Sequence, residues 1–184
     1  MQNENKLFPY QNTFPEIPDS VFLASGVKIV GDVKIGKSSS IWYNTVIRGD
    51  VNYVRIGDFT NVQDLSMLHV TNRKYPLNIG NHVTIGHSVT LHGCTLEDYT
   101  FVGMGAVLLD GSKVESLAMV AAGAVVKQGF TVPSGKLVAG IPAKIIRDLS
   151  DDEMNDIKES ALRYSKYAEL SADSLKENSN GYSE

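Results

Sequence analysis

The stretch NIGNHVTIGHSVTLHGC, residues 78–94, repeats at intervals of six residues. Val83 and Val89 are one interval apart, and so are the pairs Ile79-Gly80 and Ile85-Gly86. Glycine tolerates the positive φ that tight corners require. We therefore expect short strands that are joined by tight corners, with one strand and one corner in each hexapeptide.

The period of six extends over more than a hundred residues and predicts an all-β chain. Three hexapeptides form one triangular coil of a parallel β-helix, so residues 21–138 predict about six to seven coils. The alternative, a β-sandwich, has strands every 8–12 residues with less regular spacing. The marking residues are Val21, Val27, Val33, Ile41, Ile47, Val54, Val62, Leu68, Val83, Val89, Thr95, Phe101, Val107 and, after a step of seven, Val114, Val120, Val126, Val132 and Val138.

Interruptions of the period set the expected boundaries: a lead-in over residues 1–20, a β-helix domain over 21–145, a helix over 150–170 and a polar, frayed tail over 171–184. The nine residues from Leu68 to Leu77 predict a three-residue bulge within Val70–Asn78. Ser150 and Glu153 form a capping box that starts the helix. Its apolar stripe predicts packing along the side of the prism, and comprises Met154, Ile157, Ala161, Tyr164 and Ala168.

Composition narrows the function classes. The 184 residues have a net charge of −4, with the acidity concentrated after residue 147 and no basic stripe for nucleic acid. No apolar run reaches the roughly 18 residues of a membrane span. The single cysteine, Cys94, excludes an internal disulfide, and the first six residues lack a signal-peptide pattern. We therefore expect a cytoplasmic protein.

All four histidines lie between residues 69 and 92. His69 and His92 are 23 residues apart, which becomes 20 without the bulge and places them nearly in line on adjacent coils. His87 falls about half a face away, near a corner, so it would need a second chain to complete a site. His82 reads as a solvated turn residue and Cys94 as a small core residue.

Three imidazoles with an open fourth position are typical of a catalytic zinc site, where bound water has a pKa of about 7. Fe²⁺ or Co²⁺ also suits imidazole ligands. Three prisms in a closed ring would supply one such site at each interface. The alternative is a set of surface or interface histidines that bind no metal.

The chain resembles the γ-class carbonic anhydrase family from Val21 to the C-terminal helix. The resemblance rests on Arg48-Gly49-Asp50, Gln63-Asp64, His69, Ile85-Gly86-His87 and Leu91-His92-Gly93-Cys94. The motif Gly140-Ile141-Pro142-Ala143-Lys144 resembles one that many hexapeptide-repeat proteins share, acyltransferases included.

The resemblance implies a left-handed β-helix, with the C-terminal helix on its side, that forms a homotrimer. It implies reversible hydration of CO2 to bicarbonate by metal-bound hydroxide. By the same resemblance, the metal is held by His69 and His92 of one chain and by His87 of its neighbour. Gln63 is expected to hydrogen-bond the metal-bound water or bicarbonate, with Tyr164 close to the site. Ion pairs among Arg48, Asp50 and Asp64 are expected to hold the trimer together.

Two departures from the family pattern affect the expected rate. Val51 stands where well-characterised active members carry a glutamate, and the loop Val70–Asn78 contains no acidic residue to shuttle protons. A missing shuttle should limit the rate, because each turnover releases a proton. A hexapeptide-repeat acyltransferase and a catalytically weak, metal-binding trimeric subunit or scaffold therefore stay open as alternatives.

Overall fold

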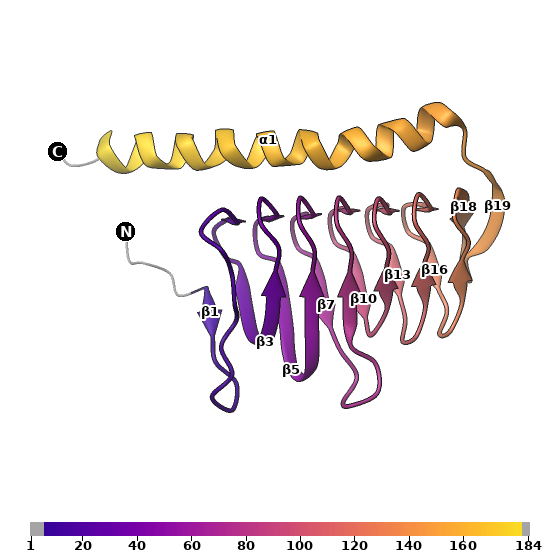
Figure 1. Ribbon diagram of the computed structural model, residues 1–184, viewed down its shortest axis with the longest axis horizontal. Helices are drawn as coiled ribbons and strands as arrows, with labels where there is room; N and C mark the ends of the chain where they lie inside the picture. Colours follow the sequence, from indigo (N-terminus) through magenta and orange to yellow (C-terminus); the bar gives the residue numbers. More distant parts are fainter. Residues whose placement is uncertain (1–5, 182–184) are drawn as a thin grey trace.

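The computed structural model describes residues 6–181 and shows a left-handed parallel β-solenoid of about seven turns with one C-terminal helix. The fold class is therefore the predicted one. Figure 1 shows the coils stacked along the long axis of the molecule, with the helix α1 running beside them. The strands are short because each must end at a corner of the triangular coil.

Three flat faces make up the prism. Face 1 contains β1 (Leu7–Phe8), β7 (Met67–His69), β10 (Thr90–His92), β13 (Val107–Leu108), β16 (Val125–Val126) and the first parts of β3 (Lys28–Ile35) and β5 (Val46–Ile56). Face 2 contains the second parts of β3 and β5 with β8 (Leu77–Ile79), β11 (Thr95–Leu96), β14 (Lys113–Val114) and β17 (Thr131–Val132). Face 3 contains β2 (Phe22–Leu23), β4 (Ser40–Ile41), β6 (Asn61–Val62), β9 (Thr84–Ile85), β12 (Phe101–Val102), β15 (Met119–Val120), β18 (Lys136–Ala139) and β19 (Lys144–Asp148).

Two positions in each hexapeptide point into the prism. One carries an aliphatic side chain, such as Ile85 or Leu91, and the position two residues earlier carries a smaller one, such as Val83 or Val89. These four side chains are fully buried. The interior is therefore a continuous apolar column, and its burial supplies most of the driving force for stacking the coils.

The residues predicted to mark the six-residue period do not point into the core between residues 95 and 107. Thr95, Phe101 and Val107 are only half-buried, whereas their neighbours Leu96, Val102 and Leu108 fill the core. The irregularity lies at Gly93-Cys94, where the inward positions Leu91 and Leu96 are five residues apart, and the predicted seven-residue step at Val114 is wrong. β-Branched and aromatic residues also suit outward strand positions, so residue type alone misled the prediction.

The loop predicted within Val70–Asn78 is present. Thr71 and Tyr75 form an isolated antiparallel bridge, so residues 71–75 make a small hairpin beside face 1. Tyr75 packs against the corner glycines: a Cβ on Gly93 would lie 2.7 Å from Tyr75 Cβ, and one on Gly111 would lie 2.9 Å from the Tyr75 ring. The insertion is thus anchored to the prism rather than free.

The lead-in and the C-terminal end both close the solenoid. In the lead-in, β1 pairs with β3 and Glu16 bridges to Lys34. At the other end, β18 and β19 pair antiparallel, which interrupts the parallel stack. Residues 1–5 lie outside the described part.

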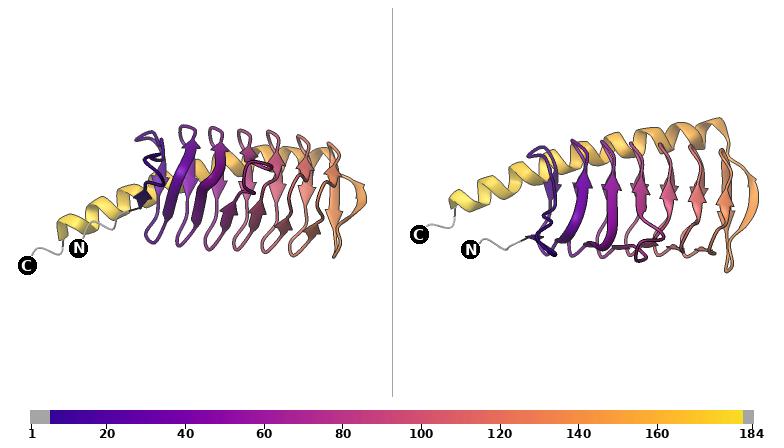
Figure 2. Two further views of the ribbon diagram at one scale, coloured as in Figure 1. Left: turned by 90° about the horizontal axis from the view of Figure 1, so that it is seen from below. Right: turned by 60° about the horizontal axis from the view of Figure 1, so that its bottom comes forward.

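The helix α1 (Asp151–Gly181) returns along the prism toward its N-terminal end, as both views in Figure 2 show. It packs on face 3 against β2, β4, β6 and β9. The predicted stripe is buried or half-buried. The helix extends past residue 170, so the predicted boundary between helix and frayed tail is wrong. Residues 182–184 of that tail lie outside the described residues. No helix among residues 6–181 is long and apolar enough to cross a membrane.

Candidate metal centre

His69 and His92 lie side by side on face 1. They are register partners on β7 and β10, and His69 Nδ1 lies 3.1 Å from His92 Nε2. The coil between them is 23 residues long, and the extra residues lie in the 71–75 hairpin. Parallel pairing at a strand spacing of about 4.8 Å is what brings two outward side chains this close.

Each of the three predicted ligands has an aspartate at one ring nitrogen. His69 Nε2 lies 3.1 Å from Asp50 Oδ1. His92 Nδ1 lies 2.7 Å from Asp110 Oδ1, and His87 Nδ1 lies 2.6 Å from Asp64 Oδ2. A carboxylate behind an imidazole fixes its tautomer and orientation and leaves the other nitrogen to bind a metal, as is usual for metal-ligating histidine.

Asp110 is a site residue that the sequence reasoning missed. It lies one 18-residue coil after His92 at the same corner, where Gly111 N donates to Gly93 O. Thr71 Oγ1 donates to its other oxygen at 2.7 Å. Burial raises the pKa of Asp110, but the bonds to Thr71 and His92 outweigh burial, so its pKa is lowered. Adding the 18 residues of one coil to the position of His92 gives residue 110, so spacing alone could have identified Asp110.

Arg48 and Asp50 form an ion pair at the N-terminal side of the stack. Burial raises the pKa of Asp50, but the hydrogen bonds to His69 and Arg48 outweigh it and the pKa is lowered. Asp64 does not join this pair within the chain, because it lies at another corner beside His87. Within one chain the trio is thus divided between two corners, and an ion-pair network that joins copies stays a prediction.

His87 lies at the corner between faces 3 and 1, directly after β9. Its side chain is 44% exposed, whereas that of His69 is only 16% exposed. Among residues 6–181 no three potential ligands converge on one point. One chain therefore brings together two of the three predicted ligands and presents the third elsewhere on its surface.

Burial is the main cause that lowers the pKa of His69, and the nearby Arg48 charge adds to it, against the opposing effect of Asp50. A lowered pKa favours the neutral ring, the form that binds metal. Three imidazoles with carboxylates behind them are a donor set suited to zinc. The residues present therefore fit the metal that the sequence implied.

Gln63 and Tyr164 line a cavity of about 480 Å³ between face 3 and α1, which His87 also lines. Gln63 is 5% exposed, and its Nε2 donates to Asn61 Oδ1 at 3.2 Å. Tyr164 packs edge-on against Trp42, with ring centroids 5.8 Å apart. Burial and then the Asp64 charge raise the pKa of Tyr164, which keeps its hydroxyl protonated at neutral pH.

The fourth histidine and the cysteine take no part in this arrangement. His82 is a corner residue with φ 55°, as expected for a turn, but its ring is stacked between Phe59 and Tyr99 rather than solvated. Cys94 is buried in the core, and burial raises the pKa of its thiol to about 12.

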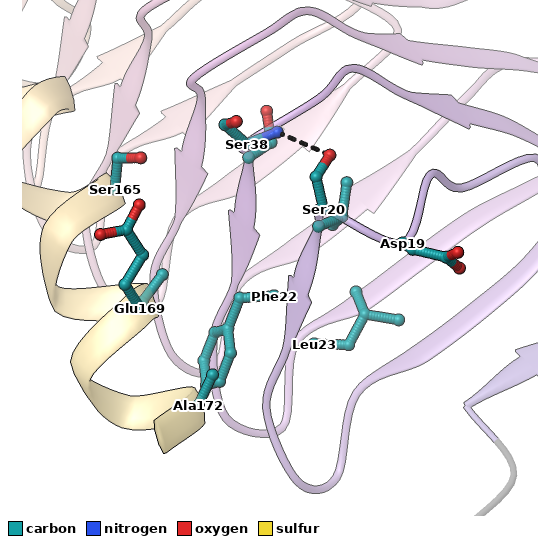
Figure 3. Close-up of a pocket in the computed structure, with 11 residues that line it drawn as sticks. Asp19, Ser20, Phe22, Leu23, Ser38, Ser165, Glu169 and Ala172 are labelled. Atoms are coloured by element: carbon teal, nitrogen blue, oxygen red, sulfur yellow. Dashed lines mark hydrogen bonds between the residues drawn. The ribbon is translucent and has the colours of Figure 1, made fainter. Parts of the chain in front are cut away.

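A second cavity, of about 380 Å³, lies between α1 and the first coils (Figure 3). Phe22, Ser38 and Glu169 are among its lining residues, and Ser38 N donates to Ser20 Oγ at 3.3 Å. None of the predicted site residues lines it. This cavity is therefore not part of the candidate site.

Comparison with known proteins supplies the family. A probable carbonic anhydrase of Methanocaldococcus jannaschii is 54% identical over 153 residues, which are 83% of this chain and 96% of that one. The chain belongs to the γ-class carbonic anhydrase family. Gamma carbonic anhydrase 1 of Arabidopsis thaliana, a mitochondrial protein, is 50% identical over 163 residues, 86% of this chain. The match spans only 59% of that plant protein.

Among solved structures, a hexapeptide transferase family protein from Anaplasma phagocytophilum has a TM-score of 0.85 and 41% identity to this γ-class chain. The match covers 89% of this chain and 96% of that one. No family model matches the chain.

Proposed function

We propose that the protein is a metal-dependent lyase that reversibly hydrates CO2 to bicarbonate and a proton. The observation that carries the proposal is the in-register pair His69 and His92, with Asp50 and Asp110 behind the two rings. Membership of the γ-class family and the names of the relatives support the same activity.

The metal would be held by His69 and His92 of one copy and His87 of a neighbouring copy in a homotrimer. Zinc suits three imidazoles best, with Fe²⁺ or Co²⁺ as alternatives. The separation of His87 from the other two supports an interface site, because one chain cannot close the ligand set. A cytoplasmic location stays a prediction from the single cysteine.

When bound, the metal would supply Lewis acidity that lowers the pKa of water to about 7. The chain's own residues would do the rest. Gln63 would hydrogen-bond the oxygens of water or bicarbonate, and the neutral hydroxyl of Tyr164 would lie at the edge of the same cavity. Asp50, Asp64 and Asp110 would hold the three imidazoles in the orientation that metal binding needs.

Metal content is the first test. We expect about one metal per chain by elemental analysis. His92→Ala should lose it, because a ligand is removed. His82→Asn is the matched control: it removes a histidine outside the site, and asparagine tolerates the positive φ at that corner. Purified protein that contains no zinc, iron or cobalt would refute the proposal.

Stopped-flow CO2 hydration on metal-verified protein is the second test. The hairpin loop carries no acid, so proton release should depend on external buffer. Turnover should rise with buffer concentration at constant pH and ionic strength. A metal-loaded protein that hydrates CO2 no faster than buffer would instead support a catalytically weak metal-binding subunit or scaffold.

The transferase name of the structural relative keeps an acyltransferase as the second candidate. That function needs one histidine as general base and a slot for an acyl-CoA between prisms. It needs neither a closed set of three imidazoles nor Arg48 and Asp50. Thermal stabilisation by acetyl-CoA but not by zinc would favour it.

A further inference from the structure

A row of buried polar side chains lies between face 3 and α1, next to the cavity that Gln63 lines. Asn61 and Thr84 belong to strands of face 3, Gln63 directly follows β6, and Ser160 comes from the helix. Their exposed fractions are 1%, 5%, 1% and 4% respectively. Polar groups this deeply buried need hydrogen-bond partners, so each bond in the row is costly to lose.

The four side chains form one chain of hydrogen bonds. Gln63 Nε2 donates to Asn61 Oδ1 at 3.2 Å. Asn61 Nδ2 donates to Thr84 Oγ1 at 3.0 Å, and Thr84 Oγ1 donates to Ser160 Oγ at 3.2 Å. The register pairing of Asn61 with Thr84 on β6 and β9 sets the middle bond, and the packing of α1 on face 3 sets the last.

The direction of the bonds decides which atom of Gln63 faces the cavity. A threonine hydroxyl has one hydrogen. In the structure that of Thr84 is directed at Ser160 Oγ, so Thr84 Oγ1 accepts from Asn61 Nδ2. Asn61 must then turn its amide nitrogen to Thr84 and its oxygen to Gln63. Gln63 in turn uses one N–H of its amide for Asn61, which leaves Oε1 as the acceptor atom that a ligand can use.

Without Ser160 the opposite arrangement becomes available. The Thr84 hydrogen could then turn toward Asn61, and both amides would reverse. The other bond that orients Asn61, from Nδ2 to Val83 O, is 3.4 Å long and too weak to hold the amide alone. A reversed Gln63 would offer a donor to the cavity in place of an acceptor.

We propose that Ser160 and Thr84 are positioning residues that hold Gln63 with Oε1 toward the cavity. The inference rests on the proposed function and deepens it. An acceptor oxygen binds an O–H group, so the site would favour water and the hydroxyl of bicarbonate over a fully deprotonated anion. Helix α1, which packs on face 3, thereby contributes to the orientation of Gln63.

The test uses metal-loaded protein of verified metal content. Ser160→Ala and Thr84→Val should each lower kcat/KM for CO2 hydration about five- to tenfold, the effect of one misaligned buried hydrogen bond. Thr84→Ser, which keeps the hydroxyl, should restore it. Thr100→Val is the matched control, because Thr100 is fully buried and its hydroxyl has no hydrogen-bond partner among the described residues.

A double-mutant cycle separates positioning from general packing. If Ser160 acts through Gln63, Ser160→Ala should have no further effect on kcat/KM in a Gln63→Ala background. An equal loss in both backgrounds would overturn the proposal.

A spectroscopic readout does not depend on turnover. The Gln63 side-chain amide signal, identified by its loss in Gln63→Ala among the four glutamines of the chain, should shift and exchange faster with solvent in Ser160→Ala. An unchanged signal would also overturn the inference. Protein that hydrates no CO2 would refute the proposed function, whereas this signal would still decide how Gln63 is held.

Discussion

At the residue scale, the main feature is that three histidines each contact a different aspartate. The pairs are His69 with Asp50, His87 with Asp64, and His92 with Asp110. The spacing of the histidines correctly predicted that His69 and His92 stack on adjacent coils, because backbone pairing puts residues of adjacent coils in register. Spacing alone did not identify the aspartate that contacts each histidine, because side-chain direction and the residues inserted at each corner decide which carboxylate reaches which ring.

The Asp110 pair predicts a loss of metal affinity. Asp110→Asn removes the negative charge behind His92, so the imidazole becomes a poorer and less well-oriented ligand. We expect metal affinity to fall about 10- to 100-fold, measured by competition with a chelator. Asp32→Asn is the control, because its carboxylate pairs with Arg55 at 2.8 Å rather than with a histidine. Equal affinities for both variants would contradict a role for Asp110.

At the element scale, the start of α1 was predictable and its end was not. Ser150 N donates to Glu153 Oε2 at 2.9 Å, and Glu153 N donates to Ser150 Oγ at 3.2 Å, which is the predicted capping box. Arg147 adds two bonds to the Glu153 carboxylate. The polar residues after 170 carried too weak a pattern to show that the helix continues, although Ala172 still lines the cavity between α1 and the first coils.

This cap predicts a pH-dependent contribution to stability. The hydrogen bond to Arg147, and then that to Ser150, lowers the pKa of Glu153 from 4.5 to about 2. Because the folded pKa lies below the unfolded one, the contribution is fully present above pH 4.5 and is lost as the pH falls toward 2. The Tm difference between wild type and Glu153→Gln should follow this course.

Glu159→Gln is the control for that experiment. Glu159 is an exposed glutamate on the same helix that does not contact the cap, so it controls for the loss of one negative charge. A Tm difference for Glu153→Gln that stays constant down to pH 2 would contradict the cap's contribution.

At the scale of the whole molecule, the prism separates the candidate ligands. His69 and His92 lie on face 1, while His87 lies at the corner next to α1. A rigid stack of coils cannot bend to bring them together, because the coils that carry these histidines are paired on both sides with their neighbours. If the site forms, it must form between copies.

Mixed oligomers test that conclusion. His87→Ala copies keep the His69 and His92 pair, and His92→Ala copies keep His87. Either variant alone should bind no metal. After unfolding and refolding as an equal mixture, random assembly into closed rings should restore about one quarter of the wild-type metal. Metal bound by either variant alone at the wild-type level would contradict an interface site.

The sequence by itself determined the solenoid, the stacking of His69 on His92, the loop after residue 70 and the capped helix on one side. These follow from periodicity and spacing, since parallel pairing repeats the same geometry from coil to coil. Only the tertiary structure decided the irregularity at Gly93-Cys94, the partners of the histidines and the hydrogen-bond chain from Gln63 to Ser160. Those features join residues on different coils and elements, and their contacts depend on corner lengths and side-chain directions that a linear pattern does not contain.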